Sequence, residues 1–284
     1  MYDTIIKKGH SQIQHGPQND RIYLMDLAKE DMPEILGTLD QMAATYGYTK
    51  IFAKVPKGFS KSFVENGYAT EAVVPDFFNG TEDCLFMGKY RDKQREKQVD
   101  HKLNNEVIER ALLKRPIKSL ELKVDNYQLP NHFSLRKAKP SDADEMSKLY
   151  AKVFDSYPFP VFESKYIRET MDNHVVYFTI CKGYEIVALS SCEMYMKDAS
   201  VEMTDFAVFP AYRGYNFSYL LLREMEKEMK KQGIKTAYTI ARSCSYGMNN
   251  TFAKCGYDFS GILVKNTQIG GKIEDMNVWY KSLK

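Results

Sequence analysis

Cysteine is sparse in this chain, and long apolar runs are missing. The five cysteines are odd in number and form no Cys-x-x-Cys pair, which argues against a disulfide framework or a zinc site. No stretch approaches the roughly 20 apolar residues that span a bilayer. The first residues also lack the apolar core of a signal peptide. By elimination, these absences predict a cytoplasmic protein without a metal ion.

An excess of charge of one sign is also lacking. The 284 residues include 40 Lys and Arg against 37 Asp and Glu, a net charge of +3. This near-neutral balance gives no reason to expect a nucleic acid or a membrane as partner. The hydrophobic content of 44% supports a sizeable core.

A charge-dense segment divides the chain. Within residues 91–118, acidic and basic residues interleave, and Val99, Leu103, Val107 and Ala111 recur every four positions. This spacing predicts a solvated helix with one apolar stripe. We interpret the segment as a connector between two domains.

Strand and helix signals alternate on both sides of the connector and predict an α/β protein. We expect an N-terminal domain over residues 1–90, the connector over residues 91–132 and a second domain over residues 133–284. The second domain reads as a strand, two helices, three strands, a helix, a strand, a helix and two strands.

The N-terminal domain contains a faint echo of the second. Residues 63–68 and 252–257 both read as a helix end followed by Gly and Tyr, between two strands. This likeness fits a degenerate or half copy of the second domain. It also fits chance, since many helices end in this way.

The most informative stretch spans residues 208–222. Pro210 ends a short apolar strand because it has no N–H to donate, and Gly214 allows a ligand to approach the backbone closely. A Leu-rich amphipathic helix follows. The free N–H groups and the positive dipole end of such a helix favour a phosphate group. The predicted ligand contacts come from Val208, Arg213, Gly214, Tyr215, Asn216, Phe217 and Ser218.

This stretch resembles the acetyl-CoA pyrophosphate loop of the GNAT N-acetyltransferase superfamily. That loop usually reads Val-x-Pro-x-x-Arg-Gly-x-Gly-x-Gly/Ala before a Leu-rich helix. Asn216 and Ser218 replace two of the usual glycines. Asn tolerates left-handed backbone and Ser is small, so we expect an intact cradle.

The GNAT resemblance implies the GNAT fold over residues 134–284 and acetyl-CoA as co-substrate. It implies that backbone N–H groups at Phe206, Ala207 and Val208 hold the thioester. It also implies that Asn249 or Asn250 binds the pantetheine arm, with a helix cap as the alternative role.

Several segments carry a closer resemblance along nearly the whole chain. Together they resemble the β-lysine N-acetyltransferase family, whose members acetylate the side-chain amine of β-lysine (3,6-diaminohexanoate). The family implies functional pairing with a lysine 2,3-aminomutase and a product used as a compatible solute. Another amine acceptor, such as lysine, a polyamine or a protein lysine, is the first alternative, and a non-catalytic CoA sensor is the second. A homodimer is compatible with the sequence. The segments are residues 11–16, 19–25, 77–80, 157–160, 202–207, 241–243 and 246–249.

The acceptor amine has a solution pKa near 10.4, so the site must remove a proton before the amine can attack. Glu202 lies six residues before Val208, where many GNAT enzymes carry a base, and Asp205 lies three before it. Strand alternation puts the two carboxylates on opposite faces, so we expect only one to face the acceptor. Position favours Glu202, and a structural hydrogen-bonded role is the alternative for each.

The general acid is not evident. Many GNAT enzymes carry a Tyr where this chain has Phe252, and Tyr246 is the substitute candidate. Alternatively, the thiolate leaves without an enzyme acid, since a thiol pKa near 8.5 makes it a fair leaving group.

A zwitterionic acceptor also needs a partner for its carboxylate. Arg21 and Arg242 are the candidates for that role. Tyr157 and Phe159 are candidates for the wall along the alkyl chain.

Overall fold

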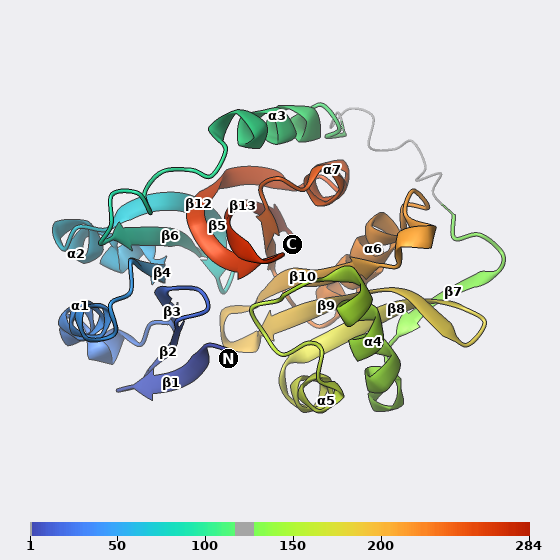
Figure 1. Cartoon of the computed structure of the whole chain (residues 1–284), viewed down its shortest axis with the longest axis horizontal. Helices are drawn as coiled ribbons and strands as arrows, with labels where there is room; N and C mark the ends of the chain where they lie inside the picture. Colours follow the sequence, from blue (N-terminus) through green and yellow to red (C-terminus); the bar gives the residue numbers. More distant parts are fainter. Residues whose placement is uncertain (1, 117–127) are drawn as a thin grey trace.

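The computed structural model describes residues 2–116 and 128–284 and contains two mixed β-sheets (Figure 1). The first sheet has the strand order β1-β2-β3-β4-β6-β5, and the second has the order β12-β13-β11-β10-β9-β8-β7. We call the first sheet with its helices the first unit, and the second sheet with its helices the second unit. Part of the predicted connector, residues 117–127, lies outside the described residues.

The first unit is built from short apolar strands and two helices. Its elements are β1 (Thr4–Lys8), β2 (Ser11–Gly16), β3 (Arg21–Asp26), α1 (Glu34–Tyr46), β4 (Lys50–Pro56), α2 (Ser60–Glu65), β5 (Ala69–Phe78) and β6 (Glu82–Tyr90). Helix α3 (His101–Leu112) follows this unit.

The second unit has the element order that the sequence predicts. Its elements are β7 (Phe133–Lys137), α4 (Ala143–Val153), α5 (Ser164–Asn173), β8 (Val175–Lys182), β9 (Glu185–Tyr195), β10 (Ser200–Val208), α6 (Phe217–Lys231), β11 (Thr236–Arg242), α7 (Tyr246–Lys254), β12 (Asp258–Ile269) and β13 (Lys272–Ser282). The prediction of strand, two helices, three strands, helix, strand, helix and two strands is therefore confirmed.

The two sheets share one topology. In each, a parallel pair is joined by a helical crossover: β3 to β4 through α1, and β10 to β11 through α6. In each, an antiparallel hairpin then follows, β5–β6 or β12–β13, whose second strand lies against the parallel pair. Six strands of the second sheet thus repeat the complete order of the first.

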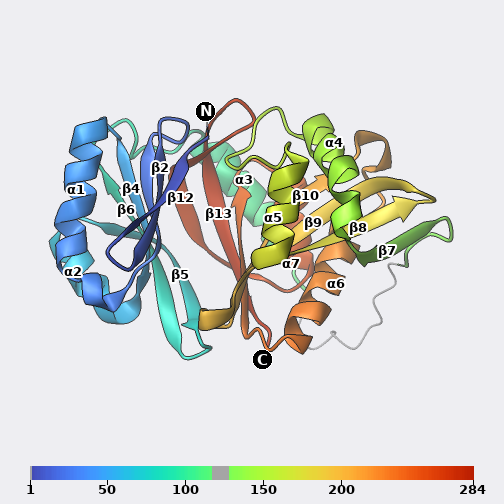
Figure 2. The ribbon, with the colours of Figure 1, turned by 90° about the horizontal axis from the view of Figure 1, so that it is seen from below.

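The units meet where the edge strands β5 and β12 lie side by side, as both views indicate (Figure 2). The Ser260 hydroxyl bridges the two strands by donating to the Val73 carbonyl and accepting from its N–H at 2.7 Å. A Cβ at Gly261 would come within 2.0 Å of the Glu71 carbonyl oxygen. This close approach requires glycine at the contact between the two units.

Helix α3 packs against α7 and covers the outer side of the β12–β13 hairpin (Figure 1). Val107 and Ala111 of the predicted apolar stripe are buried, whereas Val99 is 43% exposed. The stripe is therefore shorter than its spacing suggests. No described helix is long and apolar enough to cross a bilayer.

Candidate active site

A cavity of about 960 Å³ lies between the two units and continues along β10 to the start of α6. The first unit contributes six residues to its wall, and the second contributes the rest. Those of the first unit are Ile5, Gln12, Arg21, Tyr23, Met25 and Phe52. Most of the predicted site residues line this one space: Arg21, Tyr157, Phe159, Glu202, Asp205, Phe206, Val208, Arg213, Gly214, Asn216, Phe217, Ser218 and Arg242.

Strand separation creates this cavity. The parallel strands β10 and β11 pair only at three positions, from Ser200–Thr236 to Glu202–Tyr238. Beyond them, β10 is bulged between Thr204 and Ala207, and Asp205 has a φ of +54°. A bulge changes the direction of the strand and breaks the alternation of its side chains.

The bulge overturns one prediction. Strand alternation predicts opposite faces for Glu202 and Asp205, yet both line the cavity. The extra residue in the bulge shifts Asp205 onto the face that carries Glu202.

Glu202 stands in a row of titratable side chains across three strands. Glu193 of β9 and Tyr238 of β11 are its register partners on either side. Burial, with a smaller contribution from the neighbouring Glu193 carboxylate, raises the pKa of Glu202 to about 8, while Lys54 acts in the opposite direction. Once ionised, a carboxylate with this pKa is a stronger base than an ordinary glutamate.

Asp205 is occupied by hydrogen bonds. Its carboxylate accepts from the Tyr157 hydroxyl at 2.5 Å, the Ser191 hydroxyl at 2.6 Å and the Thr204 hydroxyl at 3.3 Å. Burial raises its pKa, and the bonds from Ser191 and Tyr157 lower it. Because three hydroxyl groups of the protein already donate to its carboxylate, Asp205 is suited to hold Tyr157 in place against the cavity.

The loop before α6 has the features of an anion cradle. Gly214 has a φ of +91° with open space around its Cβ position, and Asn216 has a φ of +58°. Asn thus adopts the left-handed conformation expected of it at this glycine position. Asn216 is the N-cap of α6 but makes no side-chain cap, so the first N–H groups of the helix stay available beside the cavity.

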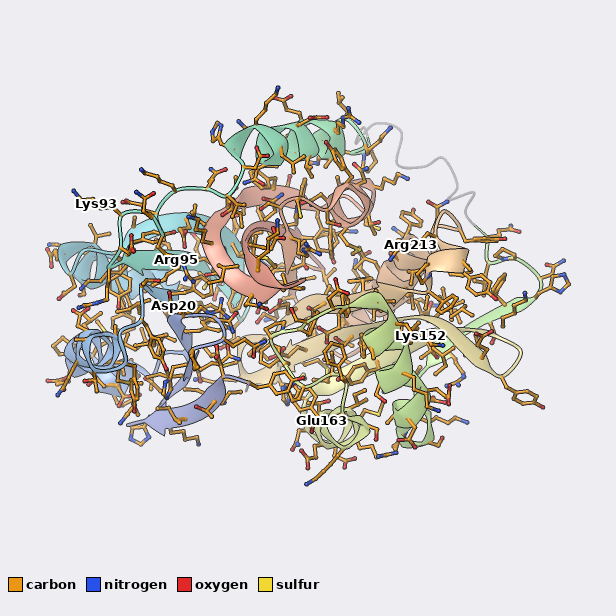
Figure 3. The ribbon with its side chains drawn as sticks, in the orientation of Figure 1. Asp20, Lys93, Arg95, Lys152, Glu163 and Arg213 are labelled. Atoms are coloured by element: carbon orange, nitrogen blue, oxygen red, sulfur yellow. The ribbon has the colours of Figure 1, made fainter. Side chains whose placement is uncertain are left out.

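Arg213 lies in the loop that leads into α6 (Figure 3). Away from this loop, Asp20 forms an ion pair at 2.9 Å with Arg95, which follows β6. The exposed Arg213 side chain lines the cavity and places a cation at the cradle. The Arg213 guanidinium and the uncapped start of α6 together fit a pyrophosphate group.

Asn249 is contradicted as a pantetheine ligand. It is fully buried, its amide donates to the carbonyls of Arg242 and Ser245, and its Oδ1 accepts from Asn277 and Trp279. Asn250 instead lines the cavity, and its buried Oδ1 has no partner within the described residues. Asn250 is therefore the asparagine that fits a ligand.

Tyr246 is contradicted as a general acid. It lies outside the cavity against α3, where desolvation and a hydrogen bond to Glu106 raise its pKa and Arg110 lies 5.3 Å from its ring centre. Phe252, at the usual Tyr position, packs edge-on against Phe206 at 5.6 Å. Two predicted cofactor contacts also lie off the cavity surface: Ala207 is fully buried and Tyr215 is 47% exposed.

Arg21 is the more available of the two arginine candidates. It is buried, and its Nη1 donates to the Asn266 carbonyl and to Thr267. Its Nη2 donates to Gln14 Oε1 at 3.4 Å, and its Nε has no partner within the described residues. Burial lowers its pKa to about 10, so it remains a cation at neutral pH. Arg242 is already paired with Glu274 at 2.8 Å.

Sequence reasoning missed Glu193, Tyr195 and Lys54. Glu193 and Tyr195 line the cavity, and the Lys54 ammonium lies 4.0 Å from the centre of the Tyr195 ring. No motif marks these residues. Only the strand register, which places Glu193 directly opposite Glu202, could have identified the first of them. No group of three or more His, Cys, Asp or Glu that could hold a metal is found within the described residues.

Comparison with known proteins agrees with this geometry. The model of the Acetyltransferase (GNAT) family matches residues 143–257. A β-lysine N(6)-acetyltransferase of Methanococcus maripaludis is 42% identical over 279 residues, 98% of each chain. A protein of the same name from Methanosarcina mazei is 33% identical over 264 residues, 88% of this chain and 97% of that one.

Among solved structures, an N-acetyltransferase of Staphylococcus aureus is 16% identical, with a TM-score of 0.48 over 54% of this chain and 99% of its own. The sequence relatives match along almost the full chain, and the GNAT match falls on the unit that holds the phosphate cradle. The chain therefore belongs to the β-lysine N(6)-acetyltransferase family of GNAT acetyltransferases.

Proposed function

We propose that this enzyme transfers the acetyl group of acetyl-CoA to the side-chain amine of β-lysine and forms N6-acetyl-β-lysine. The observation that carries this proposal is one continuous cavity. It joins an uncapped helix start and Arg213 at one end to Glu202 and Arg21 at the other. The names of the two relatives support the choice of acceptor.

Acetyl-CoA supplies an activated acetyl thioester. The N–H groups at the start of α6 and the Arg213 guanidinium would hold its pyrophosphate. The orphaned Oδ1 of Asn250 would accept a hydrogen bond from the pantetheine arm. The separation of β10 from β11 beyond Glu202 leaves β10 without a β11 partner at Phe206 and Val208, where we place the thioester.

Glu202 is the proposed base. Its pKa of about 8 lies closer to that of an amine than an ordinary carboxyl group does, so proton transfer from the ammonium is less uphill. Asp205, held by three donors, keeps Tyr157 against the acceptor chain. We assign no general acid, since Tyr246 lies outside the cavity.

Arg21 is the proposed partner of the acceptor carboxylate, with Arg242 as the weaker candidate because it already pairs with Glu274. Tyr157 and Phe159 would flank the alkyl chain. Because both units enclose the acceptor end, a small molecule fits better than a protein lysine.

We further propose the domain division predicted from the sequence, with residues 1–90 as a degenerate GNAT-like unit. The shared strand order supports this origin. A cytoplasmic location is part of the proposal, and the five cysteines, which form no disulfide within the described residues, are compatible with it. Pairing with a lysine 2,3-aminomutase would supply the substrate, and a homodimer remains part of the proposal.

Thiol release with purified protein, acetyl-CoA and a panel of β-lysine, lysine and spermidine tests this function. We expect the highest kcat/KM with β-lysine and a product acetylated at N6 by mass spectrometry. Turnover of spermidine without turnover of β-lysine would contradict the proposed acceptor.

A further inference from the structure

Glu193 lies beside Glu202 in the wall of the same cavity, and the proposed mechanism does not use it. We propose, on the basis of the proposed function, that Glu193 binds the second ammonium group of the acceptor and makes the enzyme select diamines over monoamines. In this role Glu193 determines specificity, while Glu202 handles the proton of the reacting amine.

The position of Glu193 fits a cation-binding role. It is the direct register partner of Glu202 on antiparallel strands, so both side chains leave the sheet on the same face. Its side chain is 20% exposed and lines the cavity. Two cavity residues approach it: the Tyr195 hydroxyl donates to Oε1 at 2.7 Å, and His174 Nε2 lies 3.9 Å from the same atom.

Both of these contacts fall on Oε1, which leaves Oε2 as the oxygen for a ligand. The carboxylate is therefore oriented by Tyr195 without being neutralised by it. A partly buried carboxylate that is held in place and keeps one oxygen open is a suitable partner for an ammonium group.

The charges around the cavity favour the same assignment. Three carboxyl groups, Glu193, Glu202 and Asp205, line this part of the cavity, and Arg21 is the candidate partner of the acceptor carboxylate. β-Lysine brings two ammonium groups to these carboxyl groups, whereas a monoamine acid brings only one.

Lys54 does not occupy the position that we propose for the second ammonium group of the acceptor. Its ammonium lies over the ring of Tyr195 at 4.0 Å and within 6 Å of the ring centres of Tyr23 and Phe77. Lys54 is buried and does not line the cavity. The cavity side of Glu193 is therefore left to the ligand.

Glu193→Gln tests this role because it keeps the shape of the side chain and removes its charge. We compare β-lysine with 6-aminohexanoate, which has the same carboxylate and reacting amine but lacks the second amine. We expect kcat/KM for β-lysine to fall about 10- to 100-fold, mostly through KM, and to change less than about 2-fold for 6-aminohexanoate. An equal loss for both acceptors would overturn the role of Glu193.

Glu185→Gln is the matched control, because it makes the same change on the same strand at an exposed position outside the cavity. It should leave both acceptors unaffected. If Glu193→Gln fails to fold, Glu193→Asp, which keeps the charge, should retain a preference for the diamine. Loss of that preference with an intact fold would count against the role.

Calorimetry separates this role from the proposed function. If the wild-type enzyme does not acetylate β-lysine, the proposed function fails, but binding of 1,4-diaminopentane and of pentylamine still tests Glu193. Weakened binding of the diamine alone in Glu193→Gln supports the assignment. Equal weakening of both ligands, or no weakening, rejects it.

Discussion

The two units have the same strand order, but they differ in the segment that joins the first strand of the parallel pair to the helix after it. In the second unit, β10 leads into an open loop and an uncapped helix start beside the cavity. In the first unit, Pro33 is the N-cap of α1 and has no N–H to offer. Asp31 in the same junction accepts from the N–H groups of His10 and Ser11.

This difference shows that the strand order alone does not create a phosphate site. Such a site also needs free N–H groups, space for a ligand and a nearby cation. The first unit lacks this combination at its junction but supplies Arg21, Tyr23 and Phe52 to the acceptor end of the cavity. The chemistry is thus divided: the second unit would bind the donor and provide the base, and the first would select the acceptor.

The largest expected effect concerns the base in the second unit. Glu202→Gln removes the proposed proton acceptor and should lower kcat by about 10²-fold or more, with little change in the affinity for CoA. Steady-state kinetics and calorimetry measure the two quantities. An unchanged kcat would show that the second unit does not supply the base through Glu202.

The pH profile sharpens this test. The pKa of Glu202 is raised to about 8, so in the free enzyme this group carries its proton at neutral pH and loses it as the pH rises. We expect kcat/KM of the wild type to increase through about pH 8. The same inflection should be missing from Glu202→Gln, where only the titration of the amine remains.

The next effect concerns the acceptor partner in the first unit. Arg21→Gln should raise KM for β-lysine about 10- to 100-fold and leave CoA binding unchanged, since it removes the cation that faces the carboxylate. 1,4-Diaminopentane, which is β-lysine without the carboxylate, should be affected less than about 2-fold.

Lys50→Gln is the control for Arg21→Gln. Lys50 is the register partner of Arg21, is fully buried and also donates to β12, at the Val264 carbonyl, but it does not line the cavity. It should reduce stability without a specific effect on KM. If both variants raise KM equally, Arg21 acts only through the interface between the units.

A smaller effect is expected from the cradle. Gly214→Val places a β-branched residue at a φ of +91° and puts a side chain into the open space of the loop. The Kd for CoA should rise about 10-fold. Gly183→Val, at a φ of +61° in the β8–β9 turn, has similar strain but lies away from the cavity and should leave this Kd unchanged.

The smallest effect separates two adjacent asparagines. Asn250→Ala should weaken CoA binding a few-fold and leave the free energy of unfolding nearly unchanged. Asn249→Ala should lower that free energy by about 2–3 kcal/mol, because the buried Asn277 amide and Trp279 N–H lose their shared acceptor. Chemical denaturation and calorimetry distinguish the two, and the reverse pattern would restore Asn249 as the ligand.

The sequence by itself determined the features that depend on local chemistry. The element order of the second unit follows from apolar periodicity and turn residues, and the cradle follows from Pro210, Gly214 and the Leu-rich helix. Asn216 in a left-handed conformation is equally local, since it reflects the backbone preference of one residue type.

Only the tertiary structure decided which side chains share the cavity. A bulge in β10 moves Asp205 to the face of Glu202, and two hydrogen bonds from β13 occupy Asn249 rather than Asn250. The pairing of β9 with β10 brings Glu193 opposite Glu202, and the contact of β5 with β12 brings Arg21 to the acceptor end. These relations depend on strand register and on the packing of two sheets, which residue spacing along one chain does not encode.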